Sequence, residues 1–343
     1  MDAIKVREAL KRLKQPSYRL TQILRAVYQD GASSYEEVTA LPKQLRADLA
    51  KRAPVLSFTP KKVFASASRR AYKALLRLAD GKLVESVLLR PKPSGDWSAC
   101  VSSQVGCAMG CIFCATGVMG LRRNLSAEEI ADQVLFWRQY LRRKRLGGRL
   151  SNVVYMGMGE PLHNIDNVLS SLRILLDPER LGLAARHVSV STVGILPGMK
   201  RLIEAFPQVN LAVSLHAATE RLRSRLVPVN KAYPLEQLAE TLSEVLAKTR
   251  RKIFLEYVLI AGENDGKKNA QELIRFLHKT GRADLLHVNL IAWNPIDTPL
   301  RAPTRENAQQ FRDWLRGRGA TVTIRKSLGM DIRGACGQLI SEQ

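Results

Sequence analysis

The chain contains the stretch SACVSSQVGCAMGCIFCATG (residues 98–117), in which a short β-type run leads into a loop that carries Cys107, Cys111 and Cys114. The three cysteines are spaced C-x3-C-x2-C. Three thiolates on such a loop can bind three irons of a four-iron, four-sulfur cluster and leave the fourth iron open to an external ligand. Two alternatives remain: a zinc site completed by a distant histidine, and cysteines that only pack in the core. The close spacing favours the cluster.

The run before this loop is the first of a series of apolar, β-branched runs that alternate with amphipathic stretches. The later runs are SNVVYM (151–156), HVSVST (187–192), NLAVSL (210–215), KIFLEYVLI (252–260), LHVNLI (286–291) and TVTIR (321–325). One of the helical stretches, residues 126–141, opens with a capping box formed by Ser126 and Glu129. Strands and helices that alternate at this spacing predict parallel βα units. The sequence therefore predicts an α/β fold with a partial (β/α)6-type TIM barrel at its centre.

Composition predicts three parts along the chain. Residues 1–55 have apolar residues at helical spacing and predict a small helical accessory domain. Residues 56–92 contain β-rich runs around the turn DGK (80–82) and predict a β-hairpin extension. The connector KPSGDWS (92–98) marks the start of the barrel domain, which we place at residues 93–343.

The charge balance points to a polyanionic partner. The 343 residues include 54 basic and 31 acidic side chains, a formal net charge of +23 with a pI near 10.2. An arginine-rich proteome would give the same balance, but the basic runs RRKRLGGR (142–149) and ASRRAYKALLR (67–77) favour nucleic acid. No run approaches the ~18 apolar residues of a membrane span. The charged N-terminus lacks the apolar segment of a secretory signal, so we expect a cytoplasmic protein with reduced thiols.

Polar motifs follow several of the predicted strands at the point where each strand ends. GMGEP (157–161) follows the second strand, and similar polar residues close the third, fourth and sixth. In a (β/α) barrel the active site forms at this carboxyl-terminal rim. S-adenosylmethionine (SAM) can chelate an open iron through its amino and carboxylate groups. The backbone of Gly159 and the carboxylate of Glu160 suit the ammonium group of such a ligand.

A set of motifs extends this pattern over the whole chain. They are CVSSQVGC (100–107), CIFCATG (111–117), MGMGEP (156–161), STVG (191–194), SLHA (214–217), LIAWNP (290–295) and DIRGACGQL (331–339). In these motifs the chain resembles the RlmN/Cfr family of radical-SAM RNA methyltransferases, and Pro161 and Trp293 are most like the RlmN branch. Gly334 departs from the alanine that is usual in the last motif. The resemblance implies methylation of C2 of an adenine in 23S ribosomal RNA, with Cfr-like methylation of C8 as the alternative.

The resemblance also implies roles for two further cysteines and one glutamate. Cys336 takes a methyl group from one SAM, and a second SAM is cleaved reductively to a 5′-deoxyadenosyl radical that removes hydrogen from this S-methyl group. The carbon radical then adds to the adenine, and Cys100 resolves the adduct as a disulfide with Cys336. Glu85 is the implied base, although the insert PKPSGDW changes its spacing to Cys100. Considered by their residue types alone, the two cysteines are buried core thiols and Glu85 is an exposed strand carboxylate.

The remaining SAM contacts implied by the resemblance are Ser191, Ser214, Leu215, His216 and Asn294. By residue type alone, a serine or asparagine at a strand end is a turn or cap residue, and His216 is a packed histidine. The implied cofactors are a [4Fe-4S] cluster and two SAM per turnover. The implied partners are naked or early-assembly 23S ribosomal RNA, transfer RNA as a second substrate, and an electron donor such as flavodoxin or ferredoxin. We expect a monomer that does not bind membranes.

Two other classes of protein are compatible with parts of the sequence. A zinc-stabilised RNA-binding protein would use the cysteine loop and the basic runs without catalysis. A radical-SAM oxidoreductase or maturase would use the cluster without a methyl-carrying cysteine.

Overall fold

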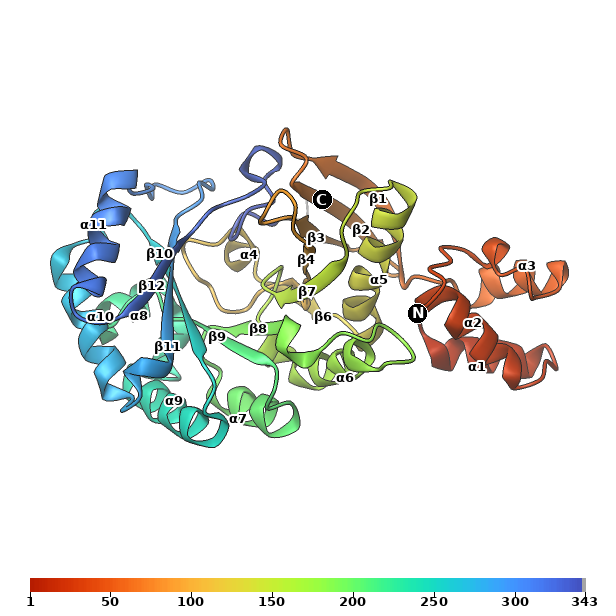
Figure 1. Ribbon diagram of the computed structural model, residues 1–343, viewed down its shortest axis with the longest axis horizontal. Helices are drawn as coiled ribbons and strands as arrows, with labels where there is room; N and C mark the ends of the chain where they lie inside the picture. Colours follow the sequence, from red (N-terminus) through yellow and green to blue (C-terminus); the bar gives the residue numbers. More distant parts are fainter. Residues whose placement is uncertain (341–343) are drawn as a thin grey trace.

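The computed structural model describes residues 1–340, and its centre is one mixed sheet with strand order β1-β2-β3-β4-β7-β8-β9-β10-β11-β12. The strands from β4 onward are parallel to one another. These parallel strands are β4 (Trp97–Cys100), β7 (Leu150–Tyr155), β8 (Val188–Thr192), β9 (Asn210–Ser214), β10 (Ile253–Leu259), β11 (Leu286–Ala292) and β12 (Thr321–Arg325). The predicted partial barrel is confirmed, because the sheet curves but its two edge strands, β1 and β12, are not paired with each other (Figure 1).

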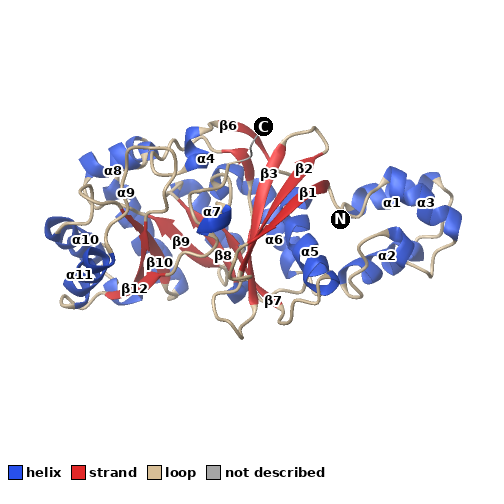
Figure 2. Ribbon diagram, turned by 90° about the horizontal axis from the view of Figure 1, so that it is seen from above, coloured by secondary structure: helices blue, strands red, loops and turns tan. Residues whose placement is uncertain are grey.

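The helices that connect the parallel strands cover the outside of the curved sheet (Figure 2). They are α5 (Ala127–Arg143), α6 (Ile165–Leu176), α7 (Leu196–Ala205), α8 (Glu220–Leu226), α9 (Leu235–Thr249), α10 (Lys267–Lys279) and α11 (Arg305–Arg316). The predicted capping box begins α5, with the Ser126 hydroxyl accepting from the Glu129 amide and the Glu129 carboxylate accepting from the Ser126 amide. Short 3-10 turns complete several connections: η2 (Pro161–Asn164), η3 (Ala185–His187), η4 (Pro228–Lys231) and η5 (Ala283–Leu285).

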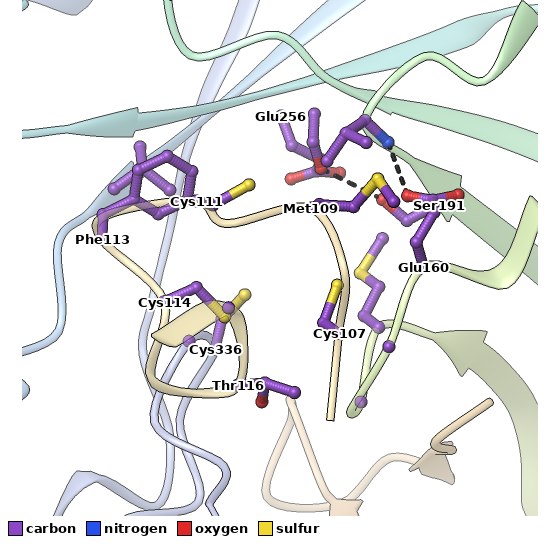
Figure 3. Close-up of a pocket in the computed structure, with 18 of the residues that line it drawn as sticks. Cys107, Met109, Cys111, Phe113, Cys114, Thr116, Glu160, Ser191, Glu256 and Cys336 are labelled. Atoms are coloured by element: carbon purple, nitrogen blue, oxygen red, sulfur yellow. Dashed lines mark hydrogen bonds between the residues drawn. The ribbon is translucent and has the colours of Figure 1, made fainter. Parts of the chain in front are cut away.

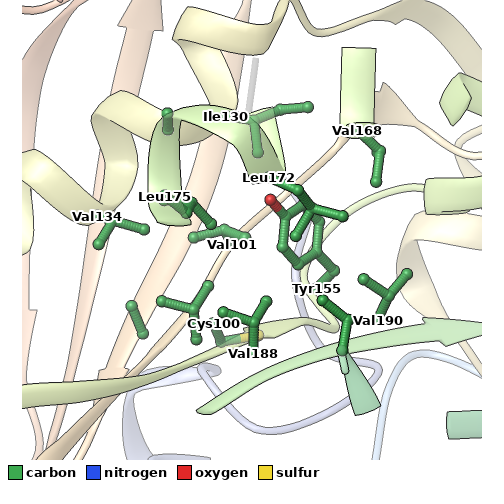
Figure 4. Packing of buried hydrophobic residues seen from close by; sticks show 14 of the residues in the cluster. Cys100, Val101, Ile130, Val134, Tyr155, Val168, Leu172, Leu175, Val188 and Val190 are labelled. Atoms are coloured by element: carbon green, nitrogen blue, oxygen red, sulfur yellow. The ribbon is translucent and has the colours of Figure 1, made fainter. Parts of the chain in front are cut away.

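The core lies between the sheet and these helices. Figure 4 shows Val188 and Val190 of β8 and Tyr155 of β7 packed against apolar side chains of α5 and α6. The Tyr155 hydroxyl is buried but bonds the Ser171 hydroxyl at 2.8 Å, so the polar group retains a partner. Alternate residues of each strand face this layer, as expected for a sheet covered by helices on one side.

The β-rich segment is an antiparallel extension of the barrel sheet. β1 (Phe58–Ala65), β2 (Ala71–Leu78) and β3 (Leu83–Leu89) pair in order, and β3 pairs with β4. The predicted turn at residues 80–82 is confirmed, since it joins β2 to β3. This extension places β3 beside the first strand of the barrel, directly behind the start of the cysteine loop.

The N-terminal helices form a lobe at one end of the elongated molecule (Figures 1 and 2). They are α1 (Ala3–Arg12), α2 (Tyr18–Tyr28) and α3 (Lys43–Arg52), with the turn η1 (Tyr35–Glu37). The lobe contacts α5, where the Gln139 side-chain amide donates to the Ala32 carbonyl at 2.8 Å and Asp132 accepts from the Ser57 amide at 2.9 Å. Within residues 1–340 no helix is long and apolar enough to cross a membrane.

A small second sheet holds the base of the cysteine loop. β5 (Gln104–Gly106) pairs with β6 (Leu121–Asn124), and the short helix α4 (Ala115–Val118) lies between them. Gly106 has φ +78°, and a Cβ there would lie 1.9 Å from the Gly120 carbonyl oxygen. That oxygen accepts from the Cys107 amide at 3.1 Å, so it is fixed in place. Only glycine allows the two ends of the loop to approach this closely.

We predict that Gly106→Ala lowers the free energy of unfolding by more than about 3 kcal/mol, because the added methyl group cannot be accommodated without separating β5 from β6. Gly120→Ala is the matched control. Gly120 also has positive φ, +69°, but no atom lies within 4 Å of its added Cβ. We expect Gly120→Ala to lower the free energy of unfolding by about 1 kcal/mol. Denaturant unfolding of the apoproteins measures both values, and equal stabilities would contradict the prediction.

Candidate active site

The carboxyl-terminal rim of the barrel surrounds a cavity. Its walls bring together most of the residues that the sequence singled out: Cys107, Cys111, Cys114, Gly159, Glu160, Ser191, Ser214, His216, Asn294 and Cys336. Figure 3 shows the cysteine loop on one side of this cavity and Glu160 with Ser191 on another. The strand-end motifs and the cysteine loop therefore line one cavity.

The cysteine loop presents its thiols to the cavity. Burial raises the pKa of Cys107 to about 12 and also raises the pKa of Cys111 and of Cys114. Neutral thiols are therefore favoured in the metal-free loop, and metal binding must release their protons. The loop is held by the barrel, because the Trp293 indole N–H donates to the Phe113 carbonyl at 3.1 Å.

The three thiols come from one short loop that lines the cavity. In the part of the chain that the structure describes, no three His, Cys, Asp or Glu side chains are grouped around one metal position. In a cubane each thiolate binds a different iron, so the three donors need not converge on one point. Three sulfur donors from one loop on one cavity wall therefore match the donor set of a four-iron cluster with one open iron.

Glu160 is a buried carboxylate at the end of β7. Its Oε1 accepts from the Leu162 amide at 2.9 Å and its Oε2 from the Val193 amide at 2.8 Å. Burial raises its pKa from 4.5 to about 7, and the two amides only partly oppose this effect. Gly159 has φ +97°, and a Cβ there would meet Gln104 at 2.5 Å. The GMGEP turn thus holds a carboxylate in the cavity that a cationic ligand would stabilise in its ionised form.

The three residues of the SLH segment (214–216), at the end of β9, differ in their contact with the cavity. Ser214 lines it, with its hydroxyl 3.4 Å from that of Ser191. The Leu215 side chain is fully buried and is not among the described residues that line the cavity. His216 Nδ1 accepts from the Val258 amide at 3.0 Å, and burial lowers the pKa of His216 to about 3. His216 is therefore a neutral, packed histidine at the cavity edge.

Cys336 lies where two cavities meet. The second cavity shares Met156, Ile291, Cys336 and Leu339 with the first, and Cys100 lines it from β4. Burial raises the pKa of Cys100 to about 12 and that of Cys336 to about 11. Cys336 nevertheless has the most exposed side chain of the five cysteines, because it faces cavity space. The interpretation of both residues as buried core thiols is therefore wrong for Cys336.

The loop that bears Cys336 is anchored on both sides of the cysteine. The Asn294 side-chain amide donates to the Cys336 carbonyl at 3.0 Å, and the Gly337 carbonyl accepts from the Ala115 amide at 2.8 Å. Asn294 thus lines the cavity as predicted, and it also connects the strand-end motif after β11 to the Cys336 loop. These bonds attach the C-terminal loop to the barrel and to the cysteine loop.

Glu85 does not join this site. Its side chain on β3 is buried, so its interpretation as an exposed strand carboxylate is wrong. The carboxylate pairs with the Lys73 ammonium at 2.7 Å and accepts from the Ile340 amide at 2.9 Å. It is not among the described residues that line either cavity. In this structure Glu85 anchors the segment that follows Cys336.

Sequence reasoning missed two charged residues at the junction of the cavities. Glu256 on β10 lines the first cavity, and Arg325 at the end of β12 lines the second. Their side chains pair at 3.1 Å, and the Asn289 amide donates to Glu256 at 2.9 Å. The signal for Glu256 was present, because it is the one charged residue inside the apolar strand IFLEYVL. The position of Arg325 depends on strand pairing and could not be inferred locally.

Comparison with known proteins agrees with this geometry. The Radical SAM superfamily model matches residues 101–277. The chain is 43% identical to a probable dual-specificity RNA methyltransferase RlmN of Symbiobacterium thermophilum, over 95% of this chain and 86% of that protein. It is 39% identical to a ribosomal RNA large subunit methyltransferase Cfr of Lachnoclostridium phytofermentans, over 98% and 97%. A crystal structure of a radical SAM methyltransferase from Sphaerobacter thermophilus superposes with a TM-score of 0.92 at 43% identity, covering 100% and 98% of the two chains. The superfamily implies a [4Fe-4S] cluster and SAM as cofactors.

We predict that stability of the apoprotein decreases as pH rises between about 4.5 and about 7, because of Glu160. In this window the unfolded chain has ionised Glu160 while the folded chain still holds the proton, so ionisation favours unfolding. The contribution is about 3 kcal/mol over the window. Glu160→Gln should remove this component and flatten the pH profile of the unfolding free energy. Glu306→Gln, at an exposed site, is the control, and the same slope in all three proteins would contradict the prediction.

Proposed function

We propose that this chain, which belongs to the RlmN/Cfr family of radical SAM RNA methyltransferases, methylates C2 of an adenine in 23S ribosomal RNA through an S-methyl group on Cys336. The observation that carries the proposal is the position of Cys336. It lies between the cavity that contains the three-cysteine loop and a second cavity lined by Cys100. A methyl group on this sulfur would face both cavities, as a methyl carrier requires.

The first cavity supplies the binding groups for both cofactors. Cys107, Cys111 and Cys114 would hold the cluster, and Glu160 with Gly159 would bind the ammonium group of SAM. Bound there, the cluster and SAM supply the methyl group and the hydrogen-abstracting radical that the reaction needs. Ser191 and Ser214 line the same cavity, and their hydroxyls would donate to the rest of the ligand.

The second cavity is where the adenine would meet Cys100 and Cys336. C2 of adenine is electron-poor and does not attack a methyl sulfonium, so a carbon attached to Cys336 must reach it. Once that carbon is bonded to C2, the adduct has to lose one electron, which a bound cluster would accept, and the C2 proton, which a base would remove. The Cys100 thiolate then attacks the Cys336 sulfur and forms an S–S bond, while the electron pair of the broken C–S bond stays on the carbon, which takes up a proton to become the methyl group. An external reductant, such as the flavodoxin or ferredoxin that reduces the cluster, restores both thiols. Arg325 lies in the same cavity and favours the ionised form of Cys100.

Glu85 has the least structural support among the proposed catalytic residues. As the base that removes the C2 proton, it would have to exchange its contacts with Lys73 and Ile340 for contact with the substrate. Ile340 follows the Cys336 loop, so a shift of that segment would remove the Ile340 contact, whereas the Lys73 contact lies between the paired strands β2 and β3 and would have to break separately. Glu85→Gln separates the two roles, since it keeps an acceptor for the Ile340 amide but cannot act as the base.

The RNA substrate is supported by charge and by the relatives. The net charge is +23, and four arginines, Arg138, Arg142, Arg145 and Arg149, are among the residues that line a cavity at the amino-terminal ends of β4 and β7. Arginines gathered in this way suit phosphate groups. We propose naked or early-assembly RNA as the substrate, because a buried adenine in a finished ribosome could not enter the second cavity. Transfer RNA is a second proposed substrate.

Methylation of C8, the alternative, is favoured by the Cfr relatives. The chain matches one of them over nearly the full length of both proteins. We place C2 first because Pro161 and Trp293 stand in motifs typical of RlmN. Nucleoside mass spectrometry of ribosomal RNA from cells with and without this protein decides the matter. Gene-dependent 2-methyladenosine supports the proposal, and 8-methyladenosine alone would overturn the choice of C2.

We predict that Cys336→Ala abolishes methylation and that Cys100→Ala stops the reaction after Cys336 has been modified. Without Cys100 the bond to the Cys336 sulfur cannot be resolved as a disulfide, so methylated or RNA-linked Cys336 should accumulate. Peptide mass analysis of purified Cys100→Ala measures this modification. Absence of any modification on the Cys336 peptide would argue for a radical-SAM enzyme of another type.

A further inference from the structure

Arg223 on α8 is a fully buried arginine whose hydrogen-bond acceptors are all neutral. Its Nε donates to the Leu215 carbonyl at 3.2 Å, and its Nη2 donates to the Val193 carbonyl at 2.6 Å. Its Nη1 donates to the side-chain carbonyl of Asn230 at 2.7 Å. Across residues 1–340 no carboxylate lies within 4.0 Å of its guanidinium nitrogens. A buried cation without a direct counter-charge costs free energy, so its presence requires an explanation.

The position of Arg223 relates it to the cysteine loop. The Ile112 amide of that loop donates to the Leu226 carbonyl, at the end of the same helix, at 3.3 Å. Loop residues Cys107, Met109, Cys111 and Phe113 pack with Leu226 and Val227 in one apolar cluster. The guanidinium lies close enough to Cys111 to favour its ionised form. The helix that carries Arg223 is thus packed against the cysteine loop, and its buried positive charge is held near a proposed cluster ligand.

Arg223 also connects the segments that form the cofactor cavity. The backbone of Val193 accepts from Arg223 through its carbonyl and donates to Glu160 through its amide. Leu215, the second acceptor, lies between the cavity residues Ser214 and His216. Arg223 itself is not among the described residues that line the cavity. It can therefore act on the site only through its field and through the peptides that it holds.

The carboxylate of Glu220, which lies on the same helix, is separated from Arg223 by an amide. The Asn230 side-chain N–H donates to Glu220 Oε2 at 2.5 Å, while the Asn230 oxygen accepts from Arg223. Because Asn230 separates the two groups, the negative charge of Glu220 offsets the positive charge of Arg223 only in part. The remaining positive field acts on the cysteine loop. When three thiolates and a cluster occupy that loop, the missing negative charge is supplied.

We propose that Arg223 is a positioning residue whose buried positive charge offsets the negative charge of the cluster-bearing loop and thereby raises the reduction potential of the cluster. Cluster potentials depend on net charge and on nearby fields. One-electron reduction adds negative charge, so a fixed cation favours the reduced state that cleaves SAM. The inference rests on the assignment of Cys107, Cys111 and Cys114 as cluster ligands and is independent of the choice between C2 and C8.

The test compares Arg223→Gln, Arg223→Lys and the control Arg221→Gln, which removes an exposed charge from the same helix. Each full-length protein is reconstituted anaerobically, and its midpoint potential is measured by redox titration followed by electron paramagnetic resonance. Iron per chain and thermal unfolding of the apoprotein are recorded alongside. We expect Arg223→Gln to shift the potential to more negative values and to lower iron per chain. Arg223→Lys and Arg221→Gln should stay near the wild-type potential.

A second variant covers the case in which Arg223→Gln does not fold. The double substitution E220Q/N230D exchanges the amide and the carboxylate, so it keeps the net charge and places an acidic group against Arg223. It should shift the potential in the same direction as Arg223→Gln. An unchanged potential in this variant or in a folded Arg223→Gln overturns the proposal. An equal shift in Arg223→Lys also overturns it, because hydrogen bonding and not charge would then be responsible. A wild-type protein that binds no cluster would instead refute the proposed function.

Discussion

The parallel alignment of the barrel strands, β4 and β7 through β12, is the constraint on which the site depends. Parallel strands all end at the same rim, and each βα loop begins there, so motifs far apart in the chain meet around one cavity. The pairing of Glu256 with Ser214 across β10 and β9 shows how register sets individual contacts. A shift of one residue would turn the Glu256 carboxylate from the cavity towards the helix layer. The strand order and register of the sheet therefore determine which side chains meet at the cavity.

The C-terminal segment completes the site from outside the barrel proper. After β12 the chain crosses the rim, makes the turn η6 (Met330–Ile332) and returns along the cysteine loop. The Thr116 hydroxyl donates to the Leu339 carbonyl at 2.6 Å, and the Gln338 side-chain amide donates to the Pro295 carbonyl at 2.9 Å. Thr116 and Leu339 are more than 200 positions apart in the sequence. These contacts also divide the interior of the rim into two cavities with Cys336 at the boundary.

The sequence predicted the residues whose chemistry is unusual and missed those whose role depends on long-range placement. The three-cysteine spacing has few structural explanations, so Cys107, Cys111 and Cys114 could be identified locally. Strand alternation likewise predicted the barrel. Glu85 could not be judged in this way, because its burial results from pairing with Lys73 across β2 and β3 and from Ile340 at the far end of the chain. Arg223 follows the SLHA motif by only a few residues, but its burial depends on three separate loops.

The distribution of charge separates the two tasks of the protein. The excess of basic residues is largely at the surface, where it can attract RNA over a Debye length. Around the cavity a few buried charges are held by specific partners. Glu160 accepts from the Val193 amide, and Arg223 donates to the Val193 carbonyl. Glu256 pairs with Arg325. In a water-poor interior such charges act strongly at short range. A surface field tuned by salt can therefore govern RNA binding without disturbing the electrostatics that the cysteine loop requires. The two regions lie at opposite ends of the strands: the arginine-lined cavity is at the amino-terminal ends of β4 and β7, and the cavity with the cysteine loop is at the carboxyl-terminal rim.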